Sequence, residues 1–512
     1  MSRFWSRSCL RRLLAMSIVA AAALLSRVPM TTAAPDFGAV DSYLRQQLET
    51  LGIPGAAVVV VDDGRIAHQA AFGKADGSGR PMTVETPVLL ASTTKSLTAI
   101  AVLQLVEQGR LELDAPVTTY LPWFRVDDPR GADITVRHLL NQSSGLSTAT
   151  GSGFESQRTQ AADTLEPAVR KLAGAQLVGT PGQAFTYSND NYTVLGLLVE
   201  TASGQRFGDY LRQQVLAPLD MEHTHTTKAA ALADGLATGH TLWFGTWWLP
   251  ADAPAPTTGM PSTTLYASAQ DLSHELIALL DRGRWRGRSI LEPSSVGTMF
   301  TPAVRVSREQ EYAMGWFVRP LVEAASPATE PPADLPVVVE HQGEWGNTHT
   351  YQAVVPSSGL GVALVINAND PSSPSRLKAI DTNILRILHG QPPAAPAIQE
   401  DWLQRQAWAV SAALLLAELA SLATSLFVLF RSRRPRRAPI LLLAAAALAL
   451  DVLLLWLAVA YVPAHFAVPL AVVVSHLPDV AVTLMPALAL ALLWSLPRTV
   501  LLLVTARRRV PR

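Results

Sequence analysis

Three long apolar stretches near the C-terminus constrain the fold of this 512-residue chain more than any other feature. They cover residues 408–430, 438–461 and 480–505. Each is long enough to cross the roughly 30 Å hydrocarbon core of a bilayer as a helix. We therefore expect residues 408–506 to form an all-α membrane domain of about three helices, with the lipid bilayer as its partner.

Basic residues flank these stretches on one side only. RSRRPRR (431–437) and ARRR (506–509) are rich in arginine, whereas the loop 463–479 contains neither Lys nor Arg. Because basic loops stay on the cytoplasmic side, we expect a multi-pass protein of the cell membrane whose preceding domain lies outside the cytoplasm. Glu418 and Asp451 lie within the stretches. They are either functional or face a neighbouring helix, and the sequence leaves both interpretations open.

The N-terminus has the pattern of an export signal, which we assign to residues 1–34. Several arginines precede a short apolar core, LLAMSIVAAAALL (13–25), and TTAAP (31–35) supplies small residues for cleavage near Ala34. An uncleaved anchor is the alternative interpretation. Cys9 is the only cysteine and lies before this core. Cleavage would leave the chain without a disulfide or a cysteine metal ligand.

Residues 36–395 have globular composition and are followed by a predicted linker, 396–407, which begins in the proline-rich stretch 391–397. Strands at both ends with helices between them predict one α+β domain. The expected elements are a helix at 40–52, a hairpin at 55–73, strands at 337–343, 348–355 and 360–367, and a helix at 375–390. Basic and acidic residues number 41 each, and no basic stripe favours a nucleic-acid partner.

Ser92-Thr-Thr-Lys95 stands at the head of a long apolar run within 89–111. One interpretation is a helix cap followed by a solvated lysine, because serine is a favoured N-cap. A second Ser-x-x-Lys, at Ser375 and Lys378, shows that the pattern alone is weak evidence. The other interpretation is a nucleophile with its base. Residues i and i+3 share one helix face, and a serine hydroxyl needs a base to become nucleophilic.

Two further motifs decide between these interpretations. Tyr187-Ser188-Asn189 precedes an apolar helix, and His341-Gln342-Gly343 lies on an expected strand. The order Ser-x-x-Lys, Tyr-Ser-Asn, His-x-Gly resembles the serine β-lactamase and penicillin-binding protein superfamily, in the branch of class C β-lactamases, D-alanyl-D-alanine carboxypeptidases and related esterases. Similar flanking stretches are ITVRHLLNQSSGL (134–146), LAPLDMEHT (216–224), LYASAQDL (265–272) and YAMGWFV (312–318).

The resemblance spans roughly residues 38–390 and implies a β-lactamase/transpeptidase-like fold, in which an antiparallel sheet carries a helical subdomain. It implies that Ser92 is the acylated nucleophile and that Lys95 and Tyr187 share proton transfer. Asn189 would hydrogen-bond the substrate amide and Lys95. Ser375 follows the third motif and is therefore interpreted as a helix cap.

The third motif departs from the pattern of many relatives. His341 stands where they have lysine, and histidine is mostly neutral at pH 7. Some carboxypeptidases and esterases of the family also have histidine here, so the departure disfavours efficient β-lactam hydrolysis but leaves those activities open. By the same resemblance, Gly343 lets substrate approach the strand, and the backbone N–H groups of Ser92 and Glu344 form an oxyanion hole.

The sequence therefore predicts a membrane-anchored serine hydrolase that acts on a D-amino-acid peptide, an ester or an amide through an acyl-enzyme. A ligand-binding sensor that does not turn over is the alternative. The resemblance implies no cofactor and no metal, and we interpret His223 and His225 as surface residues. The tryptophan-rich segment 240–259 is a lid, a membrane contact or, in the interpretation we prefer, a packed loop.

Overall fold

A computed structural model of the chain describes residues 35–147, 165–321, 336–395, 398–431 and 437–507. The predicted signal, 1–34, lies outside these ranges, as do most of the arginine-rich segment 431–437 and the end of the segment 506–509.

An eight-stranded antiparallel sheet forms the centre of the globular part, in the order β2-β1-β14-β13-β12-β11-β10-β9. The predicted hairpin and the three C-terminal strands are confirmed. The strands are β1 (Gly55–Asp62), β2 (Arg65–Gly73), β9 (Val304–Arg305), β10 (Glu311–Tyr312), β11 (Phe317–Pro320), β12 (Val337–Glu344), β13 (His349–Val355) and β14 (Leu360–Ile366). Since β1 pairs with β14, both ends of the domain meet within the sheet, next to the edge strand β2.

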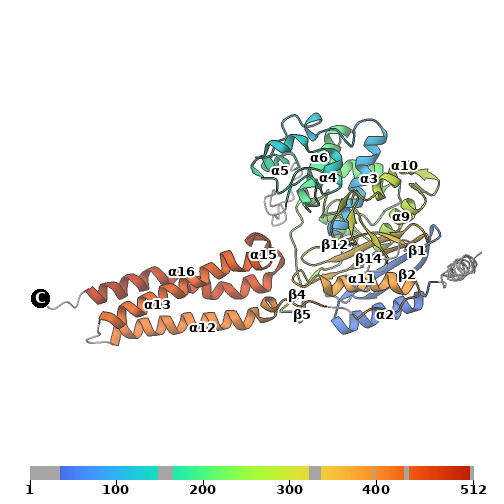
Figure 1. Ribbon diagram of the computed structural model, residues 1–512. Coiled ribbons are helices and arrows are strands. Elements are labelled where there is room, and N and C mark those ends of the chain that lie inside the picture. Colours follow the sequence, from blue (N-terminus) through green and yellow to red (C-terminus); the bar gives the residue numbers. More distant parts are fainter. Residues whose placement is uncertain (1–34, 148–164, 322–335, 396–397, 432–436, 508–512) are drawn as a thin grey trace, which may run out of the picture.

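The alternation of side chains along β1 divides the interior into two layers. Ala57, Val59 and Val61 face one core, which is shared with α3 (Thr94–Glu107) and α9 (Ala269–Leu280). Ala56, Val58 and Val60 face the other core, with α2 (Phe37–Leu51) and α11 (Ser375–Leu388). Successive residues of a strand point to opposite faces, so this apolar run is buried on both sides (Figure 1).

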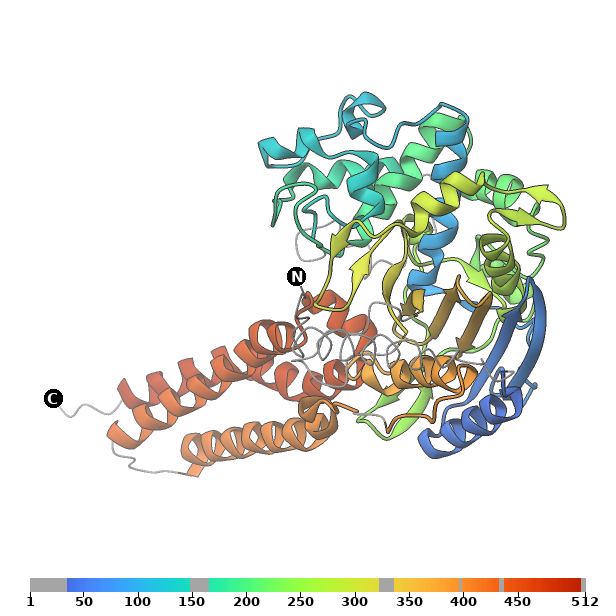
Figure 2. The same cartoon turned by 45° about the vertical axis from the view of Figure 1, so that its right-hand side comes forward.

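A helical subdomain stands on the α3 side of the sheet (Figures 1 and 2). Its helices are α4 (Val136–Leu140), α5 (Leu165–Lys171), α6 (Asn189–Ser203), α7 (Phe207–Tyr210), α8 (Lys228–Ala233) and α10 (Pro293–Phe300). The short strands are β3 (Val88–Leu89), β6 (Tyr266–Ala267), β7 (Arg284–Trp285), β8 (Arg288–Ser289) and β15 (Ala368–Asn369). Most residues of α3 are buried, because its sequence is apolar on nearly every face. The predicted α+β fold with a helical subdomain is confirmed.

The tryptophan-rich segment forms a hairpin of β4 (His240–Trp243) and β5 (Trp247–Pro250) beside the start of α12 (Figure 1). The indole N–H of Trp248 donates to the carbonyl oxygen of Leu51 at 2.8 Å. Trp247 is 58% exposed. The preferred interpretation as a packed loop therefore describes Trp248, whereas Trp247 faces outward.

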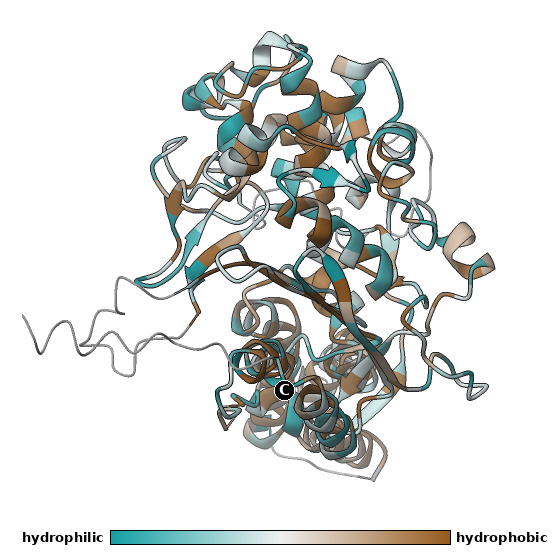
Figure 3. Cartoon of the chain, turned by 90° about the vertical axis from the view of Figure 1, so that its right-hand side faces the viewer, coloured by the Kyte–Doolittle hydropathy of each residue, from teal (hydrophilic) through white to brown (hydrophobic). Residues whose placement is uncertain are grey.

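Residues 402–507, here called the C-terminal bundle, hold three apolar helices long enough to cross a membrane: Trp402–Phe430, Arg437–His465 and Pro478–Ala506. The helices are α12 (Trp402–Arg431), α13 (Arg437–Trp456), α14 (Val462–His465), α15 (Leu470–His476) and α16 (Pro478–Arg507). The first begins at Trp402, inside the predicted linker, because the side chain of Asp401 accepts the N–H of Gln404 and caps its first turn. Figure 3 shows apolar residues along the bundle and the central strands.

A buried ionic cluster joins the three long helices. Nη2 of Arg498 lies 2.5 Å from Oδ2 of Asp451, and Nη1 lies 3.5 Å from Oε2 of Glu418. Of the two interpretations of these acidic residues, the structure supports the one in which they face a neighbouring helix. Arg498 was missed in the sequence, because the third stretch is apolar around it.

Candidate active site

Ser92 lies in a 3₁₀ turn, Ala91–Thr93, that leads into α3. The turn begins at Ala91, whose φ of 52° places an L-residue in the left-handed region, at a cost of about 1–3 kcal/mol. The neighbouring backbone holds the turn in place, since the N–H of Leu90 donates to the carbonyl oxygen of Leu265 at 2.8 Å. Ser92 therefore stands at the positive end of a buried helix, where a developing oxyanion is stabilised.

Lys95 is the second residue of α3 and is fully buried, with its Nζ next to the Ser92 Oγ. Its Nζ lies 3.1 Å from the Ser92 Oγ, 2.8 Å from the Asn189 Oδ1 and 2.9 Å from the carbonyl oxygen of Ser262. Three acceptors match the three donors of an ammonium group. The interpretation of Lys95 as a solvated residue is thus excluded, and its amine is held next to the serine.

Tyr187 and Asn189 come from the segment that leads into α6 and begins it. The hydroxyl of Tyr187 donates to the Ser92 Oγ at 2.7 Å, and Lys95 Nζ lies 4.9 Å from the centroid of its ring. Gln142 fixes this segment, because its Oε1 accepts the N–H of Ser188 at 3.0 Å. The structure therefore brings together four predicted site residues, Ser92, Lys95, Tyr187 and Asn189, around one hydroxyl group.

His341 lies on β12 in an aromatic wall and is 2% exposed. Its Nδ1 is 2.6 Å from the carbonyl oxygen of Gln342, and its Nε2 is 3.2 Å from the hydroxyl of Tyr312. Because a carbonyl only accepts, Nδ1 carries the proton and Nε2 accepts from Tyr312. Burial, together with the positive charge of Lys95, lowers the pKa of His341 to about 3. The imidazole is therefore neutral at physiological pH.

Gly343 and Glu344 follow His341 on the same strand, which runs beside the turn Ala91–Thr93. A Cβ on Gly343 would overlap the carbonyl oxygen of Leu90 and the Oγ1 of Thr350. The Thr350 hydroxyl donates to the carbonyl oxygen of Leu90 at 2.6 Å. Glycine is therefore required at position 343, because the backbone just before Ser92 lies against it. This requirement is separate from the approach of substrate to the strand, which the resemblance implies. The oxyanion hole formed by the N–H groups of Ser92 and Glu344 stays a prediction.

Sequence reasoning missed three residues that support the site: Gln142, Ser262 and Tyr312. Gln142 and Tyr312 lie in flanking stretches that resemble the family, which is the only signal that pointed toward them. Ser262 acts through its carbonyl oxygen, and a backbone contact of this kind leaves no signal in a sequence.

Two minor sequence interpretations change in detail. Ser375 was interpreted as a helix cap, but it is the first residue of α11, and Pro374 occupies the cap position. Its Oγ accepts the N–H of Gln399 instead. His223 and His225 are partly exposed and share Asp234, with ring nitrogens 2.9 Å and 2.7 Å from its Oδ2.

The sequence of this chain is similar to those of several known proteins. The Beta-lactamase family model matches residues 40–383. Protein flp of Staphylococcus aureus (strain MW2) is 26% identical over 348 residues, which cover 68% of this chain and 66% of that protein. Esterase EstB of Burkholderia gladioli is 39% identical over 197 residues, covering 36% of this chain and 49% of the esterase.

A solved structure, the octameric penicillin-binding protein homologue from Pyrococcus abyssi, is similar with a TM-score of 0.59 and 25% identity. The similarity covers 74% of this chain and 81% of that one. The family match stops before the C-terminal bundle, which begins at Trp402. The family match therefore concerns the globular part of the molecule.

Proposed function

Because the chain belongs to the beta-lactamase family of serine hydrolases, we propose that it hydrolyses an acyl substrate through an ester on Ser92. The observation that carries this proposal is the pair of short contacts at the Ser92 Oγ, 2.7 Å from the Tyr187 hydroxyl and 3.1 Å from the Lys95 Nζ. A serine becomes a nucleophile when a base within hydrogen-bond reach accepts its proton.

The reaction has two steps. In acylation, Lys95 acts as the neutral amine, after one of its three protons has passed to solvent. The Ser92 Oγ attacks the substrate carbonyl carbon, its proton passes to the Lys95 Nζ directly or through the Tyr187 hydroxyl, and the protonated relay then gives a proton to the leaving group. In deacylation, water attacks the acyl carbon, its proton returns to the same relay, and the Ser92 hydroxyl is released with the acid. Asn189 stabilises the relay by accepting a hydrogen bond from Lys95. No cofactor takes part in either step.

The substrate class we propose is an ester, an amide or a D-amino-acid peptide. A neutral His341 gives no permanent cation for a substrate carboxylate, which favours substrates whose recognition does not need one. Similarity to an enzyme named as an esterase agrees with this preference. We rank short acyl esters first and D-alanyl peptides second. Efficient hydrolysis of β-lactams is not part of the proposal.

We also propose that the C-terminal bundle anchors the enzyme in the cell membrane with the globular domain outside the cytoplasm. Three apolar helices support the anchoring, and the arginines of 431–437 and 506–509 support the orientation. Single cysteines introduced at Ala467 and at Ser432 test the orientation in intact cells. An impermeant maleimide should label the cysteine at position 467 only. Labelling only at position 432 would show the opposite orientation.

The test of the activity uses the full chain in detergent micelles with p-nitrophenyl acetate and a D-alanyl-D-alanine peptide. We expect many turnovers on the ester and a loss of turnover in Ser92→Ala. Intact mass measured during the reaction separates the two candidate functions. A Ser92 acyl adduct that forms once and persists would favour the ligand-binding sensor over the hydrolase. Equal turnover by wild type and Ser92→Ala would show that Ser92 is not the nucleophile.

A further inference from the structure

The turn that follows β12, Trp345–Thr348, links the predicted oxyanion strand to several parts of the molecule. Trp345 comes directly after Glu344 and is buried. Its indole N–H donates to the carbonyl oxygen of Pro254 at 2.6 Å, and its own carbonyl oxygen accepts from the Asn369 Nδ2 at 2.6 Å. The hydroxyl of Thr348 donates to the carbonyl oxygen of Leu89 at 2.9 Å. A displacement of this turn would therefore move both β12 and the backbone at Leu89, which leads to Ser92.

The C-terminal bundle contacts this turn directly. His476, the last residue of α15, packs edge-to-face against the ring of Trp345, with centroids 4.9 Å apart and an interplanar angle of 80°. A Cβ on Gly346 would lie 3.1 Å from the Cδ2 of His476. His476 is 9% exposed, so the contact is buried. Edge-to-face pairs of this kind fix orientation as well as bury area.

A second connection runs through β4. At one end of this strand, the N–H of Phe244 donates to the Asp479 Oδ2 of α16 at 2.8 Å, and the Gln404 Nε2 of α12 donates to the carbonyl oxygen of Leu242 at 2.7 Å. Toward its other end, the Thr241 hydroxyl donates to the carbonyl oxygen of Gly346. The bundle thus holds one end of β4, and β4 holds the same turn that His476 touches.

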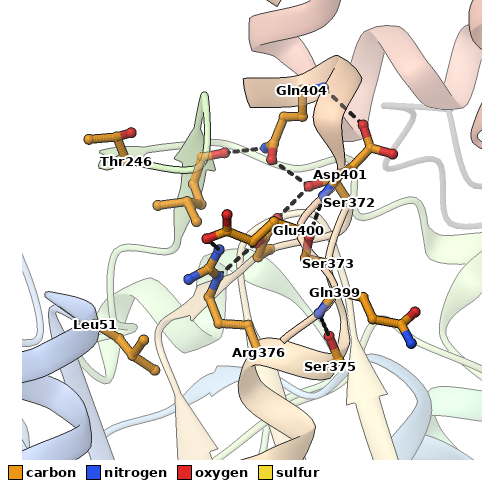
Figure 4. Close-up of polar contacts among 12 residues, drawn as sticks. Leu51, Thr246, Ser372, Ser373, Ser375, Arg376, Gln399, Glu400, Asp401 and Gln404 are labelled. Carbon is orange, nitrogen blue, oxygen red and sulfur yellow. Dashed lines mark hydrogen bonds and ion pairs between the residues drawn. The ribbon is translucent and has the colours of Figure 1, made fainter. Parts of the chain in front are cut away.

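The junction between the domain and the bundle is itself built from short polar contacts (Figure 4). Oε1 of Gln404 accepts the Ser372 hydroxyl at 2.5 Å, and the N–H of Asp401 donates to the Ser373 Oγ at 3.1 Å. Arg376 lies 3.3 Å from Glu400. A simple tether would need none of these contacts, whereas a bundle that sets the position of the domain needs a rigid junction.

From these contacts we infer that the C-terminal bundle positions the oxyanion strand, and that His476 is a positioning residue acting on the Glu344 N–H through Trp345. This inference rests on the proposed hydrolase function. It goes beyond anchoring, because the rate of acyl transfer would then depend on the position of the bundle relative to the globular domain. A preorganised donor displaced by a fraction of an ångström stabilises the oxyanion less.

The experiment compares His476→Ala, His476→Phe and a matched control, Val474→Ala, in the full chain in micelles. Val474 lies on the same helix and is 56% exposed. Ester hydrolysis is expressed per site labelled by a fluorophosphonate at saturation, so that unfolded molecules do not count. We expect His476→Ala to lower kcat about tenfold with KM little changed, which is less than the roughly 10²–10³-fold lost when one oxyanion donor is removed altogether. His476→Phe keeps the ring contact with Trp345 and should therefore retain most of the wild-type kcat.

The second connection gives an independent arm, since Asp479→Ala should also lower kcat per labelled site. The inference is overturned if His476→Ala keeps kcat within twofold of wild type. It is also overturned if His476→Phe is as impaired as His476→Ala, or if Val474→Ala loses as much. A wild-type chain that hydrolyses no ester would instead overturn the proposed function, and this outcome is distinct from the others.

Discussion

Lys95 is buried at the centre of the site, and its three contacts place its amine where a base is needed. The second Ser-x-x-Lys of the chain, Ser375 and Lys378, has the same spacing but a different environment, because Lys378 is exposed. The two lysines therefore differ in burial and in the partners that other elements supply, and not in their spacing from the serine. For Lys95 these partners are the Asn189 side chain, the Ser262 carbonyl oxygen and the ring of Tyr187.

Lys95→Met tests this role, because methionine fills a similar volume without an amine. We expect ester hydrolysis to fall about 10²–10⁴-fold, as when a general base is removed. The matched control is Lys378→Met, which changes the exposed lysine of the same pattern and should keep wild-type activity. Circular dichroism checks the fold of both variants. Equal activity of the two variants would show that Lys95 is not the base.

His341 makes stability depend on pH in a definite direction. Its folded pKa is about 3, whereas an ordinary unfolded histidine has a pKa of about 6.5. Between these values the unfolded chain binds more protons, so the free energy contributed by neutral His341 is present above pH 6.5 and is lost as pH falls. The thermal midpoint of His341→Gln should therefore fall less between pH 7 and pH 5 than that of wild type. An identical fall in both proteins would contradict the burial of a neutral imidazole.

At this scale the sequence predicts the reactive residues but not their surroundings. Ser92, Lys95, Tyr187 and Asn189 carry a spacing and an order that can be recognised. The burial of His341 depends on Tyr312, which comes from another strand, and no local pattern in the sequence encodes such a meeting.

β12 carries the predicted substrate-binding residues His341 and Gly343, and its fit against the backbone of Leu90 depends on Gly343. We expect Gly343→Ala to lower the free energy of unfolding by about 1–3 kcal/mol, as overpacking does. It should also slow the labelling of Ser92, because β12 must move away from Leu90. The control is Gly297→Ala in α10, where an added Cβ meets no atom within 4 Å. That change should stabilise the helix by about 0.5–1 kcal/mol.

Thermal unfolding should therefore shift in opposite directions in the two glycine variants, whereas labelling of Ser92 should slow in Gly343→Ala only. A Gly343→Ala protein as stable and as reactive as wild type would mean that β12 does not press on the turn.

Most elements were predictable because their patterns are local: the apolar run of β1 and the spacing of α11 are visible in the chain. The start of α12 at Trp402 was not predicted, because the cap at Asp401 precedes the apolar stretch.

The ionic cluster of Arg498, Glu418 and Asp451 links the three long helices of the bundle. We expect Arg498→Met to lower the stability of the bundle by about 3–5 kcal/mol, because it leaves two buried carboxylates without their partner. The compensated variant, with Glu418→Gln and Asp451→Asn added, should recover most of the loss. Thermal unfolding in micelles measures both. Full stability of Arg498→Met alone would show that the cluster does not hold the bundle together.

The relation between the bundle and the globular domain is the part that the sequence could not predict. The apolar stretches indicate helices and the resemblance indicates a domain, but both patterns are internal to their own segments. The contact of His476 with Trp345 joins residues far apart in the chain. Neither residue carries a pattern that would mark the other as its neighbour.

The identity of Ser92 as the activated nucleophile is tested most directly by covalent labelling of the full chain. A fluorophosphonate probe is added to the protein in micelles, and the modified residue is mapped by mass spectrometry. We predict one label on Ser92, which is lost in Ser92→Ala and retained in Ser375→Ala. Folded wild-type protein that takes no label, or that takes it on another residue, would contradict the account.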